Sequence, residues 1–301
     1  AESLDRLKHV KEIRRSLRTS SSPALHFTAG FISVTLGLVY ILGLHTPAGF
    51  TKTWFKVNGI GLYQEMCTIP MPELLTKAVR LPEDCSLCKN VHDVDKVNNI
   101  SPSEFEAIYA YSGRPVVVQD AMKNWTAPNV FGFRFFKNIY ENSEQQDACQ
   151  FFPYDTEFAT LREVFNMSYD RAEMEVGTEP WYIGWSNCDK TAAHTLRKHY
   201  SRPYFLPDTS ENKKIDWIFM GSPGYGAKMH VDNVGLPSWQ AQLKGYKKWI
   251  LQPPPECIYQ CRRLEVTVQP GEIIVLDTNR WYHETRIFSN EMSITIGAEY
   301  D

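Results

Sequence analysis

The sequence predicts a mainly β domain of closed or sandwich-like architecture with flanking helices, preceded by one N-terminal transmembrane helix. The β architecture is predicted by the last third of the chain, where short runs of alternating apolar and polar residues are separated by turn residues. The membrane helix is predicted by residues 24–44, which contain no Asp, Glu, Lys or Arg. About 20 apolar residues are required to cross the hydrocarbon core of a bilayer.

The composition fits one well-packed domain with additional segments. Of the 301 residues, 43% are hydrophobic, which is enough apolar surface for a single core. The chain has 32 basic and 35 acidic residues, and its formal net charge of −3 gives no electrostatic attraction for nucleic acid, so we expect no nucleic-acid partner.

Four segments are predicted along the chain. Residues 1–23 form a tail with a basic excess, which the positive-inside rule places in the cytosol. Residues 24–44 form the transmembrane helix, so the lipid bilayer is an expected partner. Residues 45–95 form a membrane-proximal linker with a short helix over 72–80 and a Cys-x-x-Cys motif, and residues 96–301 form the β domain.

This topology is that of a single-pass type II membrane protein whose domain lies in the secretory lumen of the ER or Golgi. Asn99, Asn124 and Asn166 each begin an Asn-x-Ser/Thr triplet, the acceptor pattern of N-glycosylation, so we expect a glycoprotein. All seven cysteines follow the apolar segment, which favours the same compartment because disulfides persist there. The mitochondrial inner membrane is the main alternative location.

The cysteines predict disulfide bonds without fixing the pairing, and their odd number leaves at least one unpaired or bonded to another chain. Six of them form three candidate pairs: Cys85 with Cys88, Cys257 with Cys261, and Cys149 with Cys188. The cysteines of the first pair either bond to each other or pair elsewhere. The second pair could close a small loop. The third pair could bond across strands or pack as buried apolar residues.

The elements of the domain follow from local signals. Ser101-Pro-Ser-Glu104 resembles a capping box with Pro at the first helical position, so a helix is predicted from there to about Tyr111. Residues 160–165 predict a second short helix, and residues 131–140 a helix or turn outside a sheet. Strands are predicted at residues 116–121, 151–152, 181–185, 216–220, 238–243, 247–251, 273–276, 281–283 and 292–296.

Three residues form a candidate metal site. His230 and Asp232 are two positions apart, so on a strand both side chains would point to one face, which in a small barrel is the interior. His283 would join them from a neighbouring strand. Two histidines and one carboxylate can hold one face of an octahedral Fe(II) and leave three positions open. Affinity alone does not select iron, because zinc and copper also bind such ligands well.

Lys247 indicates an anion beside this metal site. On the strand predicted at 247–251 it shares a face with Trp249 and Leu251. An ammonium among large apolar side chains is costly unless an anion meets it, and a dicarboxylate such as 2-oxoglutarate would supply that anion. The alternative is a lysine at a strand end whose ammonium extends into solvent.

Ordered motifs over residues 96–301 resemble the JmjC (Jumonji C) or cupin-like oxygenases. These motifs are Gly113-Arg-Pro-Val-Val-Val118 with Trp125, His230-Val-Asp232, the strand pair over 239–254, Pro270-Gly-Glu-Ile-Ile-Val275, and Trp281-Tyr-His283. The resemblance implies a double-stranded β-helix, which is a jelly-roll or cupin barrel. It implies His230, Asp232 and His283 as catalytic residues that bind Fe(II), and Lys247 and Tyr182 as residues that bind the cosubstrate 2-oxoglutarate.

Two positions depart from the family pattern. Three residues before the first histidine, where the family often has Thr or Ser, this sequence has Ala227. On the last barrel strand, where many members have Asn, the alignment places Glu299. A carboxylate beside a dianionic cosubstrate would repel it. Both departures therefore bear on whether 2-oxoglutarate binds.

Two functions are predicted from these features. The first is a membrane-anchored, Fe(II)- and 2-oxoglutarate-dependent dioxygenase that hydroxylates a side chain of a protein substrate. The alternative is a catalytically degenerate barrel that serves as an accessory or structural subunit of a membrane protein complex, which Ala227 and Glu299 favour.

Overall fold

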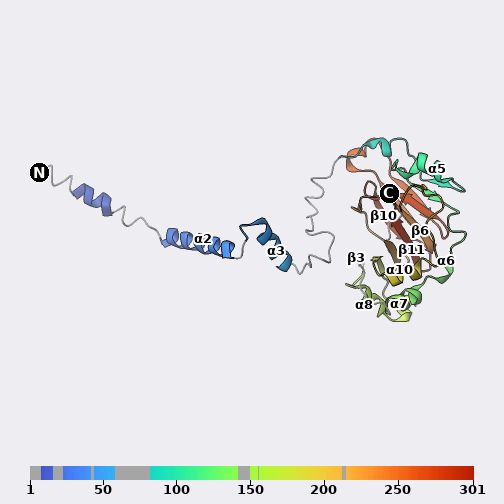
Figure 1. The fold of residues 1–301 in the computed structure, drawn as a ribbon, viewed down its shortest axis with the longest axis horizontal. Coiled ribbons are helices and arrows are strands. Elements are labelled where there is room, and N and C mark those ends of the chain that lie inside the picture. Colours follow the sequence, from blue (N-terminus) through green and yellow to red (C-terminus); the bar gives the residue numbers. More distant parts are fainter. Residues whose placement is uncertain are drawn as a thin grey trace. The chain divides into compact units, whose positions relative to one another are not determined.

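The computed structural model divides the chain into two units, Ala1–Arg80 and Leu81–Asp301 (Figure 1). The N-terminal unit contains α2 (Pro23–Ile41) and α3 (Pro47–Val57). Polar residues interrupt the sequence of α2, and among the described residues no helix is both long and apolar enough to cross a membrane. The transmembrane helix predicted at 24–44 is therefore not supported. The structure describes residues 8–15, 23–41, 44–57, 82–141, 150–154, 156–211 and 215–301, so the helix predicted at 72–80 lies outside the described residues.

The C-terminal unit is built on two β sheets, which agrees with the mainly β, jelly-roll-like fold that the sequence predicts. The larger sheet has the strand order β1-β2-β9-β6-β11-β5-β4-β3, and the smaller has the order β10-β7-β8. The strands are β1 (Asp95–Val97), β2 (Val116–Val118), β3 (Gln150–Phe152), β4 (Tyr182–Asn187), β5 (Asp216–Gly221), β6 (Ser238–Lys244), β7 (Lys247–Gln252), β8 (Leu264–Val268), β9 (Ile273–Leu276), β10 (Tyr282–Ile287) and β11 (Ser293–Glu299).

Alternation along the strands supplies apolar side chains to both faces of the larger sheet. On β9, Ile273 and Val275 join the core outside the barrel, whereas Ile274 and Leu276 join the core between the two sheets. The apolar strands thus separate two layers of buried side chains.

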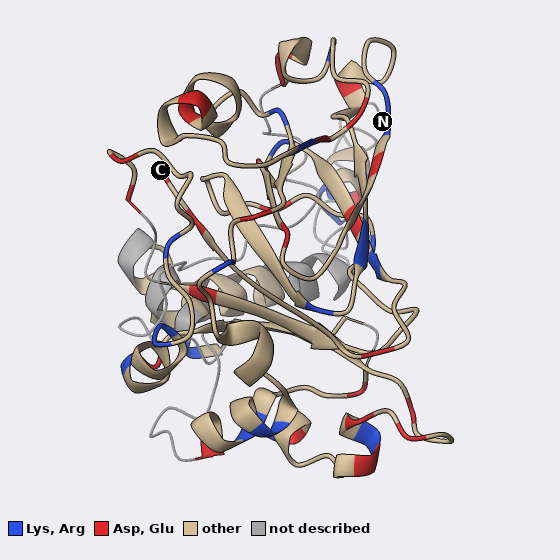
Figure 2. Ribbon diagram, turned by 90° about the vertical axis from the view of Figure 1, so that its right-hand side faces the viewer, with Lys and Arg blue, Asp and Glu red and all other residues tan. Residues whose placement is uncertain are grey.

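Short helices contribute to the outer core. Ser101 caps the first of them, because its hydroxyl accepts from Glu104 N at 3.2 Å, as the predicted capping box requires. In the view of Figure 2, acidic and basic residues are interspersed along helices and loops, in keeping with the small net charge. The helices are α5 (Pro102–Phe105), η2 (Glu106–Ala110), α6 (Ala127–Val130), α7 (Phe133–Glu141), α8 (Leu161–Phe165), α9 (Tyr169–Ala172) and α10 (Lys190–Leu196), with two short turns, η1 (Cys85–Leu87) and η3 (Pro255–Cys257).

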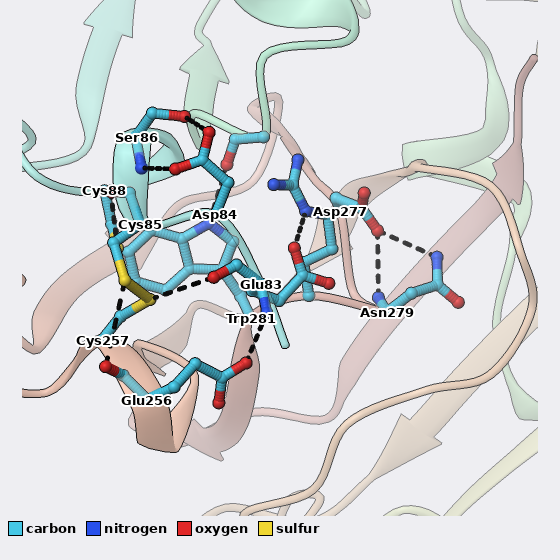
Figure 3. A network of polar contacts seen from close by, with 12 residues as sticks. Glu83, Asp84, Cys85, Ser86, Cys88, Glu256, Cys257, Asp277, Asn279 and Trp281 are labelled. Carbon is cyan, nitrogen blue, oxygen red and sulfur yellow. Dashed lines mark hydrogen bonds and ion pairs between the residues drawn. A yellow bond between two sulfur atoms is a disulfide. The ribbon is translucent and has the colours of Figure 1, made fainter. Parts of the chain in front are cut away.

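Two disulfides join η1 to the loop that contains η3. Figure 3 shows the one between Cys85 and Cys257. Cys85 bonds to Cys257 and Cys88 bonds to Cys261, so the small loop predicted between Cys257 and Cys261 is wrong. Of the two alternatives for Cys85 and Cys88, pairing elsewhere in the chain is the one observed, and a bond between these two cysteines is not. Cys188 is also disulfide-bonded, whereas Cys149 lies outside the described residues.

This disulfide clamp lies beside the start of β10. Glu83, next to η1, accepts from Arg280 Nε at 2.7 Å, while its backbone N–H donates to the Glu256 carboxylate at 2.6 Å (Figure 3). Trp281 follows Arg280, is fully buried, and donates from its indole nitrogen to Gly113 O at 2.7 Å. The entry of β10 into the barrel is therefore held by covalent, ionic and packing contacts.

Candidate metal and cosubstrate site

A cavity of about 370 Å³ lies between the two sheets. Its walls come from β3, β4, β5, β6, β7, β10 and β11, together with the segment that leads from β5 to β6. Part of that segment, residues 225–230, runs antiparallel to β10 and forms backbone hydrogen bonds with it. The candidate metal ligands and Lys247 all line this one cavity.

His230, Asp232 and His283 converge in the cavity. Asp232 Oδ1 lies 3.4 Å from His230 Nε2, and Asp232 Oδ2 lies 3.8 Å from His283 Nε2. One ligand atom from each residue lies within 4.8 Å of the other two. The backbones of His230 and His283 exchange two hydrogen bonds, of 3.0 and 2.7 Å. The three residues are therefore close enough to share one ion.

The strand expected to carry both His230 and Asp232 is only partly formed. His230 makes a single β-bridge, with His283, and Asp232 follows it outside any strand. The backbone N–H of Asp232 instead donates to Thr278 O at 2.9 Å. The Asp232 carboxylate therefore reaches the imidazoles from an irregular segment of backbone. The sequence instead predicted that His230 and Asp232 would share one face of a strand.

Backbone carbonyls orient the two imidazoles. His230 Nδ1 lies 2.6 Å from Lys228 O, and His283 Nδ1 lies 3.1 Å from Trp281 O. A carbonyl oxygen only accepts, so in each ring Nδ1 carries the proton and donates it. Each Nε2 then faces Asp232 and is the nitrogen available to a metal. This arrangement is the outer-shell hydrogen bonding that fixes the tautomer of metal-binding histidines.

The electrostatics favour the ligand forms of His283 and Asp232. For His230, burial acts to lower the pKa, but the hydrogen bond with Asp232 and its charge outweigh burial and raise it above its usual value. Burial lowers the pKa of His283 to about 4, so its imidazole is neutral at pH 7. Burial would raise the pKa of Asp232, but the hydrogen bond from His230 and the charges of both imidazoles lower it below its usual value. A neutral imidazole and a carboxylate are the forms that bind a metal. The residues present therefore fit a divalent ion.

Lys247 is buried at the inner end of the cavity, with 1% of its surface exposed. Its ammonium donates to Tyr182 Oη at 3.2 Å and to Thr295 Oγ1 at 2.7 Å. No carboxylate of the described part of the chain pairs with it, and burial lowers the pKa of Lys247 to about 7. The alternative of a lysine that extends into solvent is excluded by this burial. A buried cation with only neutral partners is a suitable site for a ligand carboxylate.

Thr295 also lies beside Lys247, and it was not predicted from the sequence as a site residue. Its hydroxyl accepts from Lys247 and donates to Gln242 Oε1 at 3.0 Å. Ile294 and Ile296 pack in the outer core, so strand alternation could have predicted that Thr295 faces the interior. Thr285, on β10, accepts from the backbone N–H of Ala227 at 3.1 Å. Hydroxyls from β10 and β11 thus lie near the end where Ala227 supplies none.

Glu299 does not lie beside Lys247. It is four residues beyond Thr295 on β11, roughly 14 Å along the strand at about 3.4 Å per residue. Its Oε1 accepts from the indole Nε1 of Trp217 at 2.7 Å. The repulsion expected between Glu299 and the cosubstrate is therefore not supported, because the hydroxyl of Thr295 occupies the place beside the ammonium.

Comparisons with known proteins find similarity to proteins named as demethylases and hydroxylases. It is 26% identical over 165 residues to the bifunctional arginine demethylase and lysyl-hydroxylase psr-1 of Caenorhabditis elegans, covering 52% of this chain and 40% of that protein. It is 21% identical over 263 residues to the arginine-specific demethylase JMJ20 of Arabidopsis thaliana, covering 68% of this chain and 56% of that protein. The chain thus spans about half the length of these relatives.

The structure of YcfD, a ribosomal oxygenase from Escherichia coli, matches 67% of this chain and 51% of its own with a TM-score of 0.44 and 18% sequence identity. No family model matches the sequence.

Proposed function

We propose that this chain, a relative of the JmjC-domain hydroxylases and demethylases, is an Fe(II)- and 2-oxoglutarate-dependent oxygenase that hydroxylates a protein side chain. The curated relatives confirm the resemblance to JmjC oxygenases that the sequence motifs indicate. The observation that carries the proposal is the convergence of His230, Asp232 and His283 in one cavity with a buried Lys247, which pairs with no carboxylate of the described residues. The names of the relatives, which include a lysyl-hydroxylase and arginine demethylases, support a protein substrate.

The residues divide between a metal and a cosubstrate. His230, Asp232 and His283 would hold Fe(II), leaving positions open for other ligands. Lys247 would pair with one carboxylate of 2-oxoglutarate, and the hydroxyls of Tyr182 and Thr295 would hold the ammonium in place. Bound iron would supply the activation of O2, with the oxidative decarboxylation of 2-oxoglutarate to succinate and CO2 as the source of electrons.

The protein's own contribution is positioning and exclusion of water. Trp249 is buried, and its ring lies 5.9 Å from that of His283, which restricts the imidazole. Phe219 also lines the cavity, with its ring 5.8 Å from Lys247 Nζ. Ion pairs formed beside Lys247, which is buried, are stronger than in bulk solvent. The fixed cation and imidazoles can therefore orient a dicarboxylate without rearrangement of the strands.

Succinate release tests the proposal directly. We expect the full chain with Fe(II), 2-oxoglutarate and a pool of candidate protein substrates to release succinate, and we expect His230→Ala to abolish the release. His194→Ala is the matched control, because His194 is exposed on α10 and does not line the cavity. The degenerate-barrel alternative predicts no succinate above the His230→Ala background and no thermal stabilisation by 2-oxoglutarate, since a ligand that binds only the folded state must stabilise it.

A further inference from the structure

The two disulfides of the clamp differ in how far they are buried. Cys88 and Cys261 are 1% and 8% exposed, so the bond between them lies in the core. Cys257 is fully buried, but its partner Cys85 is half-buried, and the residues on either side of Cys85 are exposed. A thiolate breaks a disulfide by attacking one of its sulfurs, so access to the sulfur decides which bond is exchanged. Cys85 is therefore the most accessible cysteine of the clamp to a reductant.

The Cys85–Cys257 bond holds together a small polar network (Figure 3). Glu83, two residues before Cys85, accepts from Arg280 Nε at 2.7 Å, and its backbone N–H donates to the carboxylate of Glu256 at 2.6 Å. The side chains of Arg280 and Glu83 are only 24% and 20% exposed, so water screens this ion pair less than it screens a surface pair. Because Glu256 precedes Cys257, the disulfide fixes both sides of the network.

Contacts lead from this network to the imidazole of His283. Arg280 precedes Trp281, whose carbonyl oxygen lies 3.1 Å from His283 Nδ1. Trp281 and Trp249 belong to one buried apolar cluster with three cysteines of the clamp, and the ring of Trp249 lies 5.9 Å from that of His283. The carbonyl and the ring that orient this imidazole are therefore both attached to the part of the core that the clamp closes.

We propose that the Cys85–Cys257 disulfide is a thiol-exchange site, and that a dithiol reductant acting there loosens the start of β10 and weakens metal binding by His283. The part of this inference that concerns metal rests on the proposed function. The part that concerns β10 does not, because the contacts between the clamp and this strand exist without a metal.

The exchange takes place in two steps. A thiolate of the reductant forms a bond with Cys85 Sγ while the bond to Cys257 breaks, and Cys257 leaves with the electron pair and takes up a proton. The second thiol of the reductant then attacks its own sulfur in the mixed disulfide and releases Cys85, which is also protonated. The reductant is oxidised to a disulfide, and the chain gains two electrons and two protons.

The buried disulfide keeps the domain closed after this exchange. The two bonds join cysteines that are 172 and 173 residues apart, so they close nearly the same loop of chain. The entropy of loop closure changes only slowly with loop length, so one remaining bond constrains the unfolded chain almost as much as two. Exchange at Cys85 therefore releases Glu83 and its neighbours locally and leaves the barrel folded.

Thiol mapping tests where exchange occurs. The undenatured full chain is treated with dithiothreitol, and after quenching in acidic denaturant the free thiols are labelled with N-ethylmaleimide and located by peptide mass spectrometry. We expect Cys85 and Cys257 to become thiols roughly tenfold faster than Cys88 and Cys261, since access controls the attack. Equal rates for the two bonds would overturn the exchange site.

A double variant, Cys85→Ser with Cys257→Ala, tests the effect on β10 without any reductant. We expect amide hydrogen exchange at residues 280–283 of the metal-free protein to become roughly three- to tenfold faster. The affinity for Mn(II), read from the EPR signal of the free ion, should fall by a similar factor. Outer-shell partners typically change metal affinity by about 10–100-fold, and this bond acts one contact farther away.

Glu83→Gln separates the disulfide from the ion pair that it holds. This variant keeps both bonds, should raise the exchange rates similarly, and should add little to the double variant, because both act through one contact. Glu173→Gln is the matched control, since it removes an exposed ion pair, with Arg134, outside the clamp. Unchanged exchange at residues 280–283 in the double variant would overturn the inference. Absence of Mn(II) binding by the oxidised wild type would count against the proposed function instead, and the exchange rates would still decide the role of the clamp.

Discussion

The two halves of the candidate metal and cosubstrate site differ in how the chain holds them. His283 and Lys247 lie on paired strands and are 3% and 1% exposed. The side chains of His230 and Asp232 lie on the irregular segment between β5 and β6 and are 35% and 32% exposed. Side chains of the strand-borne half lose their water when the domain folds, whereas those of the loop-borne half remain partly hydrated. The first half should therefore affect the stability of the ligand-free protein, and the second mainly ligand binding.

Replacing each histidine in turn should separate these effects most strongly. We expect His230→Ala and His283→Ala each to reduce succinate release at least 100-fold, because each removes one of three metal ligands. In urea unfolding without metal, His283→Ala should lower the free energy of unfolding by about 1–2 kcal/mol through lost packing against Trp249, and His230→Ala by less than about 0.5 kcal/mol. Equal destabilisation by both would contradict the difference between the halves.

Lys247→Met should stabilise the ligand-free protein while preventing 2-oxoglutarate binding. Methionine has a similar length and removes a buried charge that lacks an anionic partner. Because the hydroxyls of Tyr182 and Thr295 lose a donor, we expect a net gain of only about 1–3 kcal/mol in the free energy of unfolding at pH 7. Thermal shifts with and without 2-oxoglutarate measure both effects. A destabilised variant that still responds to 2-oxoglutarate would disprove this role of the lysine.

The buried ammonium of Lys247 should also make the free energy of unfolding depend on pH. The pKa of Lys247 is about 7 in the folded protein and about 10.4 in an unfolded chain, so between these values the unfolded state binds more protons. The free energy of unfolding should then rise with pH over this window, by up to about 1.4 kcal/mol per unit from this group. The contribution of Lys247 is obtained by measuring the free energy of unfolding of the wild type and of Lys247→Met in urea at several pH values from 7 to 10, and subtracting one from the other. Parallel curves would show that the lysine is not desolvated.

The residues on strands could be predicted from the sequence more fully than those on the irregular segment. The strand-borne half could be predicted from alternation, since Lys247 shares a face with buried Trp249 and Leu251 as expected. Asp232 reaches the metal site through an irregular turn, which has no periodicity, so its place could be predicted from the motif but not from strand geometry.

Long-range pairing was the least predictable feature. Cys85 and Cys257 are 172 residues apart, and local spacing instead suggested that Cys257 bonds to Cys261. Sequence separation contains no information about which turns become neighbours when a sheet closes. The displacement of Glu299 from Lys247 has a similar origin, because a shift of four residues on one strand keeps the same face but reaches the other end of the cavity.

Replacing Ala227 should have the smallest effect on 2-oxoglutarate binding. The replacement tests whether hydroxyls on the strands make up for the hydroxyl that the irregular segment lacks at Ala227. Ala227 is buried, and its backbone N–H donates to the hydroxyl of Thr285. If Thr285, Thr295 and Tyr182 already supply the hydroxyls of this end, Ala227→Ser should change the affinity for 2-oxoglutarate by less than about threefold, below about 0.7 kcal/mol. Isothermal titration with Mn(II) in place of Fe(II) measures this change, and Ala227→Val controls for added volume. A tenfold gain confined to the serine variant would mean that the strand hydroxyls do not replace the missing one, and that the irregular segment limits how tightly the cavity binds its cosubstrate.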